Sequence, residues 1–244
     1  MKNISRISYA NISSLCILFA LSACGGGGST SAPSVQPVLS KDYVAYHFSA
    51  PVFQSTSGKM NDLGAGVSSA ILPKGSFTYD ASGQYSWGGG LSGGIVIYPS
   101  SENPRLPFAA MLCESMNQID KKGTYVLIGT DATRVTNPIE LAGQRFVNVS
   151  NCAESRKPEL INFDAQGNLL NTIFLNTDDQ IGTTLKYSLA DFAQMQTSEG
   201  LNLTSYSMRL HAYKRVVAGQ TQFILVEQTK SLRAGGSDYI DIWK

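Results

Sequence analysis

Short stretches in which apolar and polar residues alternate dominate the chain from residue 43 onward. Such alternation is typical of β-strands with one buried face, because successive side chains point to opposite sides of a sheet. Residues 54–66 lack this pattern, and we expect them to form a loop. Stretches rich in Val, Ile, Tyr and Phe predict strands at 43–48, 67–72, 94–98, 124–129, 145–150, 172–175 and 239–243.

The clearest local pattern is a β-hairpin over residues 76–87. Two strand-like runs flank the turn residues Ala81-Ser82-Gly83. Gly83 suits the left-handed position that closes a three-residue loop. In this register four aromatic residues form two cross-strand pairs on one face of the sheet: Tyr79 with Tyr85, and Phe77 with Trp87.

Two further hairpins follow the same pattern. Asp164 precedes Ala165-Gln166-Gly167, and we expect Gly167, like Gly83, to have a positive φ. The third hairpin spans 206–228 and turns at Val217-Ala218-Gly219. Its predicted register pairs Leu210 with Val226, Ala212 with Ile224, and Arg209 with Glu227.

Helix signals are few. Ser188 and Asp191 form a capping box before the run 189–197, and Gly200 can end that helix. A second helix could begin at Pro107 and carry Met116, although a strand over 108–114 also fits. The whole pattern predicts a mainly β fold, an antiparallel β-sandwich or barrel with one or two short helices.

The first 24 residues have a different character. Lys2 and Arg6 precede the apolar run 15–21, which is too short to span a bilayer and is typical of a secretory signal. The stretch Leu21-Ser22-Ala23-Cys24 resembles the lipobox of bacterial lipoproteins. That resemblance implies cleavage before Cys24, acylation of Cys24, and anchoring in a membrane. Gly25, in place of the Asp that retains such proteins in the inner membrane, favours the outer membrane.

The signal peptide (1–23) is followed by a region with no strand pattern. Residues 24–40 comprise the lipidated Cys24 and a tether rich in Gly, Ser and Pro, which favour flexible chain. Residues 41–244 then form one β-rich domain. This general plan of lipid anchor, glycine-rich tether and hairpin-rich domain is similar to that of surface lipoproteins of the transferrin-binding type, although no motif supports binding of an iron protein.

Composition limits the classes of partner. The whole chain has 19 basic and 18 acidic residues, and loss of Lys2 and Arg6 with the signal leaves 17 and 18, a formal charge of −1. Such a balance provides no basic field for nucleic acid. After processing, Cys113 and Cys152 are the remaining cysteines not bound to lipid, and in an oxidising compartment we expect them to form a disulfide.

Catalytic and metal-binding patterns are weak. His47 and His211 lie in separate strands and do not have the spacing of metal ligands, so we expect neither a metal nor a cofactor. The run 90–94 matches the letters of a nucleophile elbow, but a strand instead of a helix follows Ser92. No catalytic residue is assigned on these grounds.

Two function classes remain. The first is a non-enzymatic binding protein, held to the membrane by lipid, that contacts an envelope protein, a glycan or a small ligand. Its possible ligand-binding residues are the four aromatic residues of the first hairpin, Phe77, Tyr79, Tyr85 and Trp87. The same rings could instead form the core of the domain. The second class is a periplasmic hydrolase or sugar-active enzyme that uses acidic residues.

Overall fold

The structure is a computed structural model of the chain, and it divides into two compact units, residues 1–37 and 38–244. All of the residues that it describes belong to the second unit. The described ranges are 39–49, 52–62, 66–69, 76–79, 84–87, 93–97, 106–113, 124–150, 159–174, 181–236 and 238–244.

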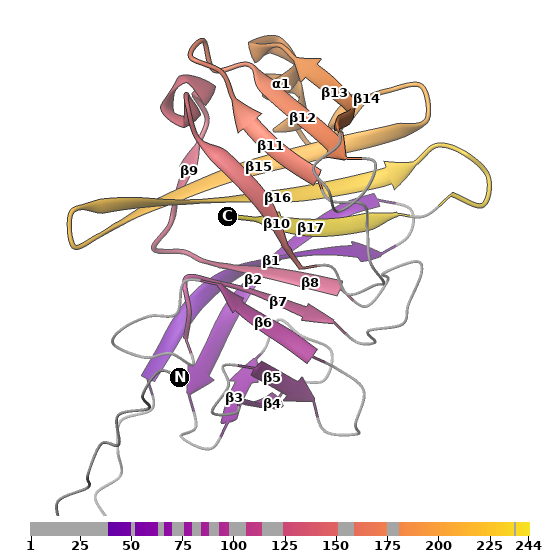
Figure 1. Cartoon of the computed structure of the whole chain (residues 1–244). Coiled ribbons are helices and arrows are strands. Elements are labelled where there is room, and N and C mark those ends of the chain that lie inside the picture. Colours follow the sequence, from indigo (N-terminus) through magenta and orange to yellow (C-terminus); the bar gives the residue numbers. More distant parts are fainter. Residues whose placement is uncertain are drawn as a thin grey trace, which may run out of the picture. The chain divides into compact units, whose positions relative to one another are not determined.

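The first sheet is a closed antiparallel barrel in which the strands follow chain order and β8 pairs with β1. Figure 1 traces these strands in indigo and magenta. They are β1 (Leu39–Ser49), β2 (Val52–Asp62), β3 (Gly66–Ser69), β4 (Ser76–Tyr79), β5 (Gln84–Trp87), β6 (Gly93–Ile97), β7 (Ala109–Cys113) and β8 (Thr124–Gly129).

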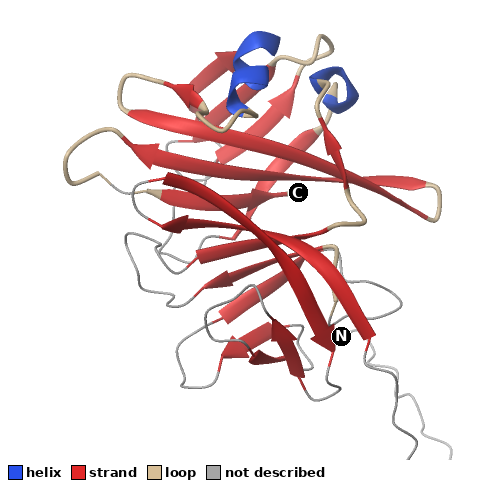
Figure 2. Cartoon of the chain, turned by 180° about the vertical axis from the view of Figure 1, so that it is seen from behind, coloured by secondary structure: helices blue, strands red, loops and turns tan. Residues whose placement is uncertain are grey.

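The second sheet is open and has nine strands in the order β13-β12-β11-β10-β17-β16-β15-β14, with β9 pairing on β15. Figure 2 shows its two short helices in blue. The strands are β9 (Thr133–Val135), β10 (Arg145–Ser150), β11 (Glu159–Phe163), β12 (Leu169–Phe174), β13 (Ile181–Tyr187), β14 (Leu201–Asn202), β15 (Tyr206–Val217), β16 (Gln220–Ser231) and β17 (Tyr239–Trp243). The helices are the 3-10 helix η1 (Pro138–Leu141) and the α-helix α1 (Leu189–Met195).

The predicted mainly β fold is confirmed, and β8, β10 and β17 match their predicted bounds. The loop predicted at 54–66 is wrong, because β2 occupies most of it. Its polar sequence is held as a strand by hydrogen bonding to β1 on one side and β3 on the other. The helix considered from Pro107 is wrong as well. Residues 109–113 form β7 between β6 and β8, as the strand alternative required.

The hairpin predictions had different outcomes. The structure pairs Phe77 with Trp87 and Tyr79 with Tyr85, as predicted, while Gly83 lies outside the described residues. Gly167 has φ +80° and closes its loop by donating to the carbonyl of Asp164, which confirms the second hairpin.

The third hairpin was predicted one residue out of register. Its loop has two residues, Ala218 and Gly219, with φ of 50° and 77°, and Val217 pairs with Gln220. Two positive φ values give the turn whose twist matches that of paired strands. Consequently Leu210 lies opposite Glu227, Ala212 opposite Leu225, and Arg209 opposite Gln228.

The helix α1 forms as its capping residues predict. The Ser188 side chain accepts from the Asp191 backbone N–H, and the Asp191 carboxylate accepts from the Ser188 N–H at 2.7 Å. The helix buries Phe192 and Met195 against the second sheet. Within the described part of the chain, no helix is long and apolar enough to cross a membrane.

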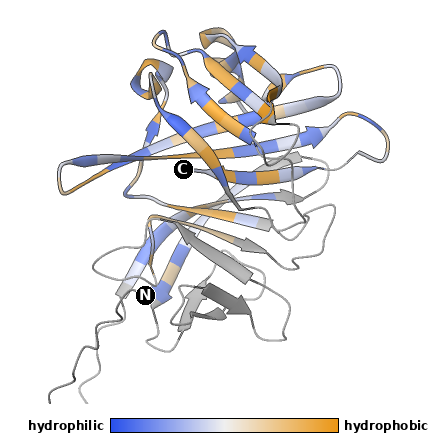
Figure 3. Cartoon of the chain, viewed as in Figure 1, coloured by the Kyte–Doolittle hydropathy of each residue, from blue (hydrophilic) through white to orange (hydrophobic). Residues whose placement is uncertain are grey.

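The three central strands β15, β16 and β17 are buried on both faces. One face contributes Ile224, Val226, Ile240 and Ile242 to a core shared with barrel residues such as Val126 and Ile128. The other face contributes Leu210, Leu225 and Trp243 to a second core, which α1 covers. Figure 3 shows the apolar and polar positions that alternate along strands of this sheet. The second sheet therefore carries a core on each side.

This packing also fixes which positions of the barrel point inward. Val44, Val126 and Met111 belong to the core shared with the second sheet, so their side of the barrel is the outer one. Side chains alternate along a strand, so Tyr43, Ala45 and Leu127 take inner positions. All three are fully buried.

Candidate functional site

The structure describes only part of the predicted site. Cys24 and Cys152 lie outside the described residues. Cys113 ends β7, but its side chain is not among those described. Lipidation and the disulfide therefore stay predictions.

The predicted aromatic residues can be placed through backbone pairing alone. Tyr43 and Met60 take inner positions, and Met60 pairs with Ser69, two residues along β3 from Val67. Val67 pairs with residue 77, which pairs with residue 87. Residues 79 and 85 share that face, because each is two positions away. The four aromatic residues thus occupy positions on the inner face of the barrel, across from β8 and β1.

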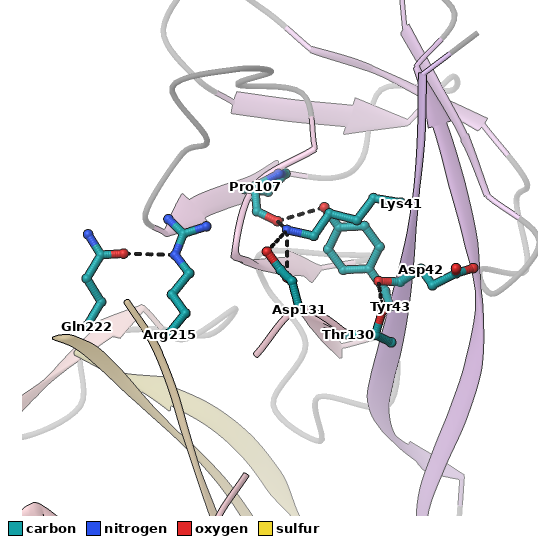
Figure 4. Close-up of polar contacts among 8 residues, drawn as sticks. All are labelled: Lys41, Asp42, Tyr43, Pro107, Thr130, Asp131, Arg215 and Gln222. Atoms are coloured by element: carbon teal, nitrogen blue, oxygen red, sulfur yellow. Dashed lines mark hydrogen bonds and ion pairs between the residues drawn. The ribbon is translucent and has the colours of Figure 1, made fainter. Parts of the chain in front are cut away.

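One rim of the barrel gathers polar contacts around the start of β1, as Figure 4 shows. The Lys41 ammonium lies 2.8 Å from the Asp131 carboxylate, and the Tyr43 hydroxyl donates to the Pro107 carbonyl at 2.7 Å. The Thr130 backbone N–H donates to the Asp42 carbonyl at 2.9 Å. These contacts fix the start of β1 to the two chain segments that reach this rim.

A second polar group lies where the two sheets meet. The Tyr46 hydroxyl of the barrel contacts the Tyr213 hydroxyl of β15. Beside them, the Arg134 guanidinium donates to His211 Nδ1 at 2.8 Å and to the Gln196 carbonyl at 2.7 Å. These contacts link β1, β15, β9 and the end of α1.

The electrostatics of this junction follow from burial. His211 is 1% exposed, and burial together with the charges of Arg134 and Arg209 lowers its pKa to about 3. The ring is therefore neutral at pH 7 and accepts a hydrogen bond through Nδ1. Burial likewise raises the pKa of Tyr46 and of Tyr213. His47, which contacts the Tyr125 ring in the barrel, has a pKa lowered by burial.

Two carboxylates are buried in the second sheet. Glu227 and Asp241 are cross-strand neighbours, 2% and 0% exposed. Glu227 accepts from the Thr229 hydroxyl at 3.0 Å and from the Tyr239 hydroxyl at 3.2 Å. Asp241 lies in a central strand of the sheet, between β10 and β16, in the interior of the fold. The described residues hold no group of three or more His, Cys, Asp or Glu that could bind a metal.

An exposed feature of the described part of the chain is the end of the β15–β16 hairpin, which we call the hairpin tip (residues 216–221). β9 pairs with β15 only up to Lys214, and β17 pairs with β16 only from Leu225 onward. Among described residues, no other strand flanks the tip, which Figures 1 and 2 show extending beyond the rest of its sheet. Nothing lies within 4 Å of where a Gly219 Cβ would be.

The base of this hairpin is held on both faces. On one face the Arg215 guanidinium lies 4.6 Å from the centre of the Phe108 ring, and its Nε donates to Gln222 at 2.9 Å. On the other face Lys214 forms an ion pair with Glu140 of η1. Because Phe108 follows Pro107, the hairpin base and the start of β1 contact the same short segment of the barrel rim.

Sequence reasoning missed the hairpin tip because it assigned Val217 to the turn. The usable signal was Val216-Val217, two apolar residues directly before a turn, where a hairpin has no core to cover. Comparison of the chain with known protein families, with curated proteins and with solved structures finds no match.

Proposed function

We propose that this chain is an outer-membrane lipoprotein, anchored through Cys24, whose β domain binds a partner and performs no chemistry. The observation that carries the binding role is the hairpin tip. It exposes Val216 and Val217 at the end of strands whose other parts are buried on both faces. An exposed loop on a rigid scaffold is the usual arrangement for recognition.

The polar groups of the described residues support a structural role for the titratable side chains. His211 bonds Arg134, Lys41 bonds Asp131, and Glu227 accepts from two hydroxyls. Each contact joins different strands or loops or satisfies a buried group, which stabilises the fold. The binding surface then relies on shape, apolar contacts and hydrogen bonds, since the processed chain is nearly neutral.

The anchor is tested by labelling cells with a radioactive fatty acid. The parent protein should incorporate label, and Cys24→Ala should not. Cys24→Ala should also accumulate as an uncut or soluble form. Equal labelling of both proteins would remove the anchor from this proposal.

The ligand could be a glycan, an envelope protein or a small molecule that contacts Phe77, Tyr79, Tyr85 or Trp87. The test compares Trp87→Ala with the parent chain in a glycan and envelope-protein pull-down and in a thermal melt. A role in binding predicts lost affinity with an unchanged melt. A role in the core predicts a loss of about 3–5 kcal/mol in the free energy of unfolding.

We also propose the Cys113–Cys152 disulfide as part of the exported form. The two cysteines enclose a loop of about 40 residues, for which the chain-entropy model gives roughly 4 kcal/mol. Peptide mapping of the non-reduced protein should recover the linked pair. Alkylation of both thiols in the native, non-reduced protein would contradict it.

The alternative is a hydrolase that uses acidic residues, and Glu227 with Asp241 is the pair that favours it. Both side chains are almost fully covered, whereas a substrate must reach a catalytic carboxylate within hydrogen-bond distance. Turnover of a glycoside or ester by the purified protein, abolished by Glu227→Gln without loss of fold, would establish the enzymatic role instead.

A further inference from the structure

We infer that the hairpin tip inserts into the surface of the lipid bilayer, so that the domain has a membrane contact besides its acyl anchor. The inference rests on the proposed function: it takes the lipid anchor as given and names the bilayer surface as the partner that the hairpin tip binds. The inference itself rests on the exposure, charge and position of residues 214–221.

Exposure is the first argument. Val216 is 67% exposed and Val217 is 37% exposed, and they lie on opposite faces of the hairpin because they are adjacent in β15. Ala218 and Gly219 complete an uncharged turn, and nothing lies within 4 Å of where a Gly219 Cβ would be. The tip thus presents apolar side chains on both of its faces. A bilayer interface can surround both faces at once, whereas a flat protein surface can cover only one.

Charge is the second argument. The hairpin from residue 206 to residue 226 contains no Asp or Glu, and the acid that contacts its base, Glu140, is neutralised by its ion pair with Lys214. Arg215, which packs on the Phe108 ring, leaves a net positive charge directly below the tip, at the level where an inserted hairpin meets headgroups. Anionic headgroups therefore meet no net repulsion while the valines enter the apolar region.

Position is the third argument. The hairpin base and the start of β1 contact the same rim segment, Pro107 and Phe108. The predicted tether joins the domain at the start of β1, so it meets the domain on the rim from which the hairpin extends. A tether of about 15 residues has a root-mean-square reach of about 20 Å, which keeps the tip at a high effective concentration near the bilayer.

A protein groove is a weaker candidate for the same tip. Stable protein interfaces bury about 800 Å² on each partner, more than a turn of six residues offers. Insertion needs no such area, because each valine fully transferred from water favours the bound state by roughly tenfold or more. For a domain already held near the membrane, that gain is enough to fix its orientation.

The test uses the chain from residue 24 onward carrying Cys24→Ala, produced without the signal segment so that it has no acyl group, with vesicles of phosphatidylglycerol and of phosphatidylcholine. The partition coefficient comes from co-sedimentation. The tip variant is Val216→Asp with Val217→Asp. The control variant is Ile181→Asp with Leu232→Asp, which adds the same charge at exposed apolar positions, 66% and 51% exposed, outside the hairpin tip.

We expect the parent chain to bind phosphatidylglycerol vesicles, the tip variant to lose at least about tenfold in partition coefficient, and the control to change less than about threefold. Thermal melts of all three proteins should agree. In a second measurement, brominated lipids should quench the fluorescence of the tryptophan introduced by Val216→Trp.

A parent chain that stays in the supernatant overturns the inference, as does equal loss in the tip and control variants. Because this chain has no acyl group, either result leaves the fatty-acid labelling test of Cys24 unaffected. A protein that incorporates no fatty acid would in turn leave the vesicle result unchanged, so the two proposals fail separately.

Discussion

The barrel and the nine-stranded sheet differ in their edge strands: the barrel has none, and the second sheet is open. The barrel pairs β8 with β1, so every strand has two neighbours and no edge is left. The second sheet ends at β13 and β14, each with one neighbour. Helix α1 contacts both of these strands. The Tyr187 hydroxyl of β13 also lies 3.3 Å from the Tyr206 hydroxyl of β15. These contacts bring the two ends of the curled sheet near each other.

The difference shows where each sheet can gain stability. A closed barrel buries its inner positions by itself, so its outer face is available to pack on another element, and here it packs on β15–β17. The open sheet cannot bury a face alone. It covers one face with α1 and the other with the barrel, so among the described residues of this sheet most buried side chains lie in its central strands.

The largest expected effect comes from removing a side chain that packs in the core between the second sheet and α1, away from the barrel. Trp243 is fully buried on the face covered by α1. Trp243→Ala should lower the free energy of unfolding by about 3–5 kcal/mol, because it leaves a large cavity. Chemical denaturation measures the change, with the exposed Val216→Ala as control, expected within about 0.5 kcal/mol. A loss below 1 kcal/mol would contradict the assignment of Trp243 to the core.

A change at the shared face tests whether the two sheets unfold together. Ile242→Ala should cost about 3 kcal/mol, since Ile242 is fully buried in the core that the second sheet shares with the barrel. Amide hydrogen exchange should then speed up in β8 as well as in β17. If the amides of β8 kept their protection, the barrel would be an independent folding unit.

The junction also predicts that the stability of the protein depends on pH. The pKa of His211 is about 3 in the fold, below its ordinary value near 6.5, so the unfolded chain binds a proton that the folded chain does not. Stability is therefore complete above pH 6.5 and falls as the pH drops toward 3, by about 2 kcal/mol between pH 7 and pH 5.

Comparing His211→Asn with the parent chain isolates this contribution, because Asn can still accept from Arg134 and does not titrate. Denaturation at several pH values should give a flatter profile for the variant. A small slope should persist, since burial lowers the pKa of His47 as well. Identical slopes for the two proteins would show that His211 is not the titrating group.

The smallest expected effect concerns the open edge. Ile181 begins β13, is largely exposed, and has no counterpart in the edgeless barrel. Ile181→Lys should change the free energy of unfolding by less than about 0.5 kcal/mol, yet slow aggregation on heating, because a charge on an edge strand opposes pairing with other chains. Light scattering during a thermal ramp measures this, and unchanged scattering would mean that the edge does not start aggregation.

Much of the architecture was predictable from local pattern. The first hairpin register followed from its turn residues, and the cap of α1 from Ser188 and Asp191. The third register was wrong because a non-glycine residue, Ala218, takes a positive φ, which residue type alone does not indicate. β2 was missed because pairing with two neighbours, not its own sequence, makes it a strand.

The candidate site was harder to predict, because its features depend on contacts distant in sequence. Lys214 and Glu140, or Arg215 and Phe108, are brought together only by the fold. The exposure of Val216 depends on where β9 and β17 stop, which no local pattern gives. Likewise, the burial of Asp241 follows from its place in a central strand instead of from its residue type.

The position of β17 has a consequence for folding during synthesis. This strand lies between β10 and β16 in the middle of the second sheet, yet it follows every other strand along the chain. A chain that emerges from its N-terminus cannot complete that sheet, or cover the outer face of the barrel, until residues 239–243 have emerged. The second sheet should therefore stay incomplete, and the outer face of the barrel uncovered, until nearly all of this sequence has been synthesised.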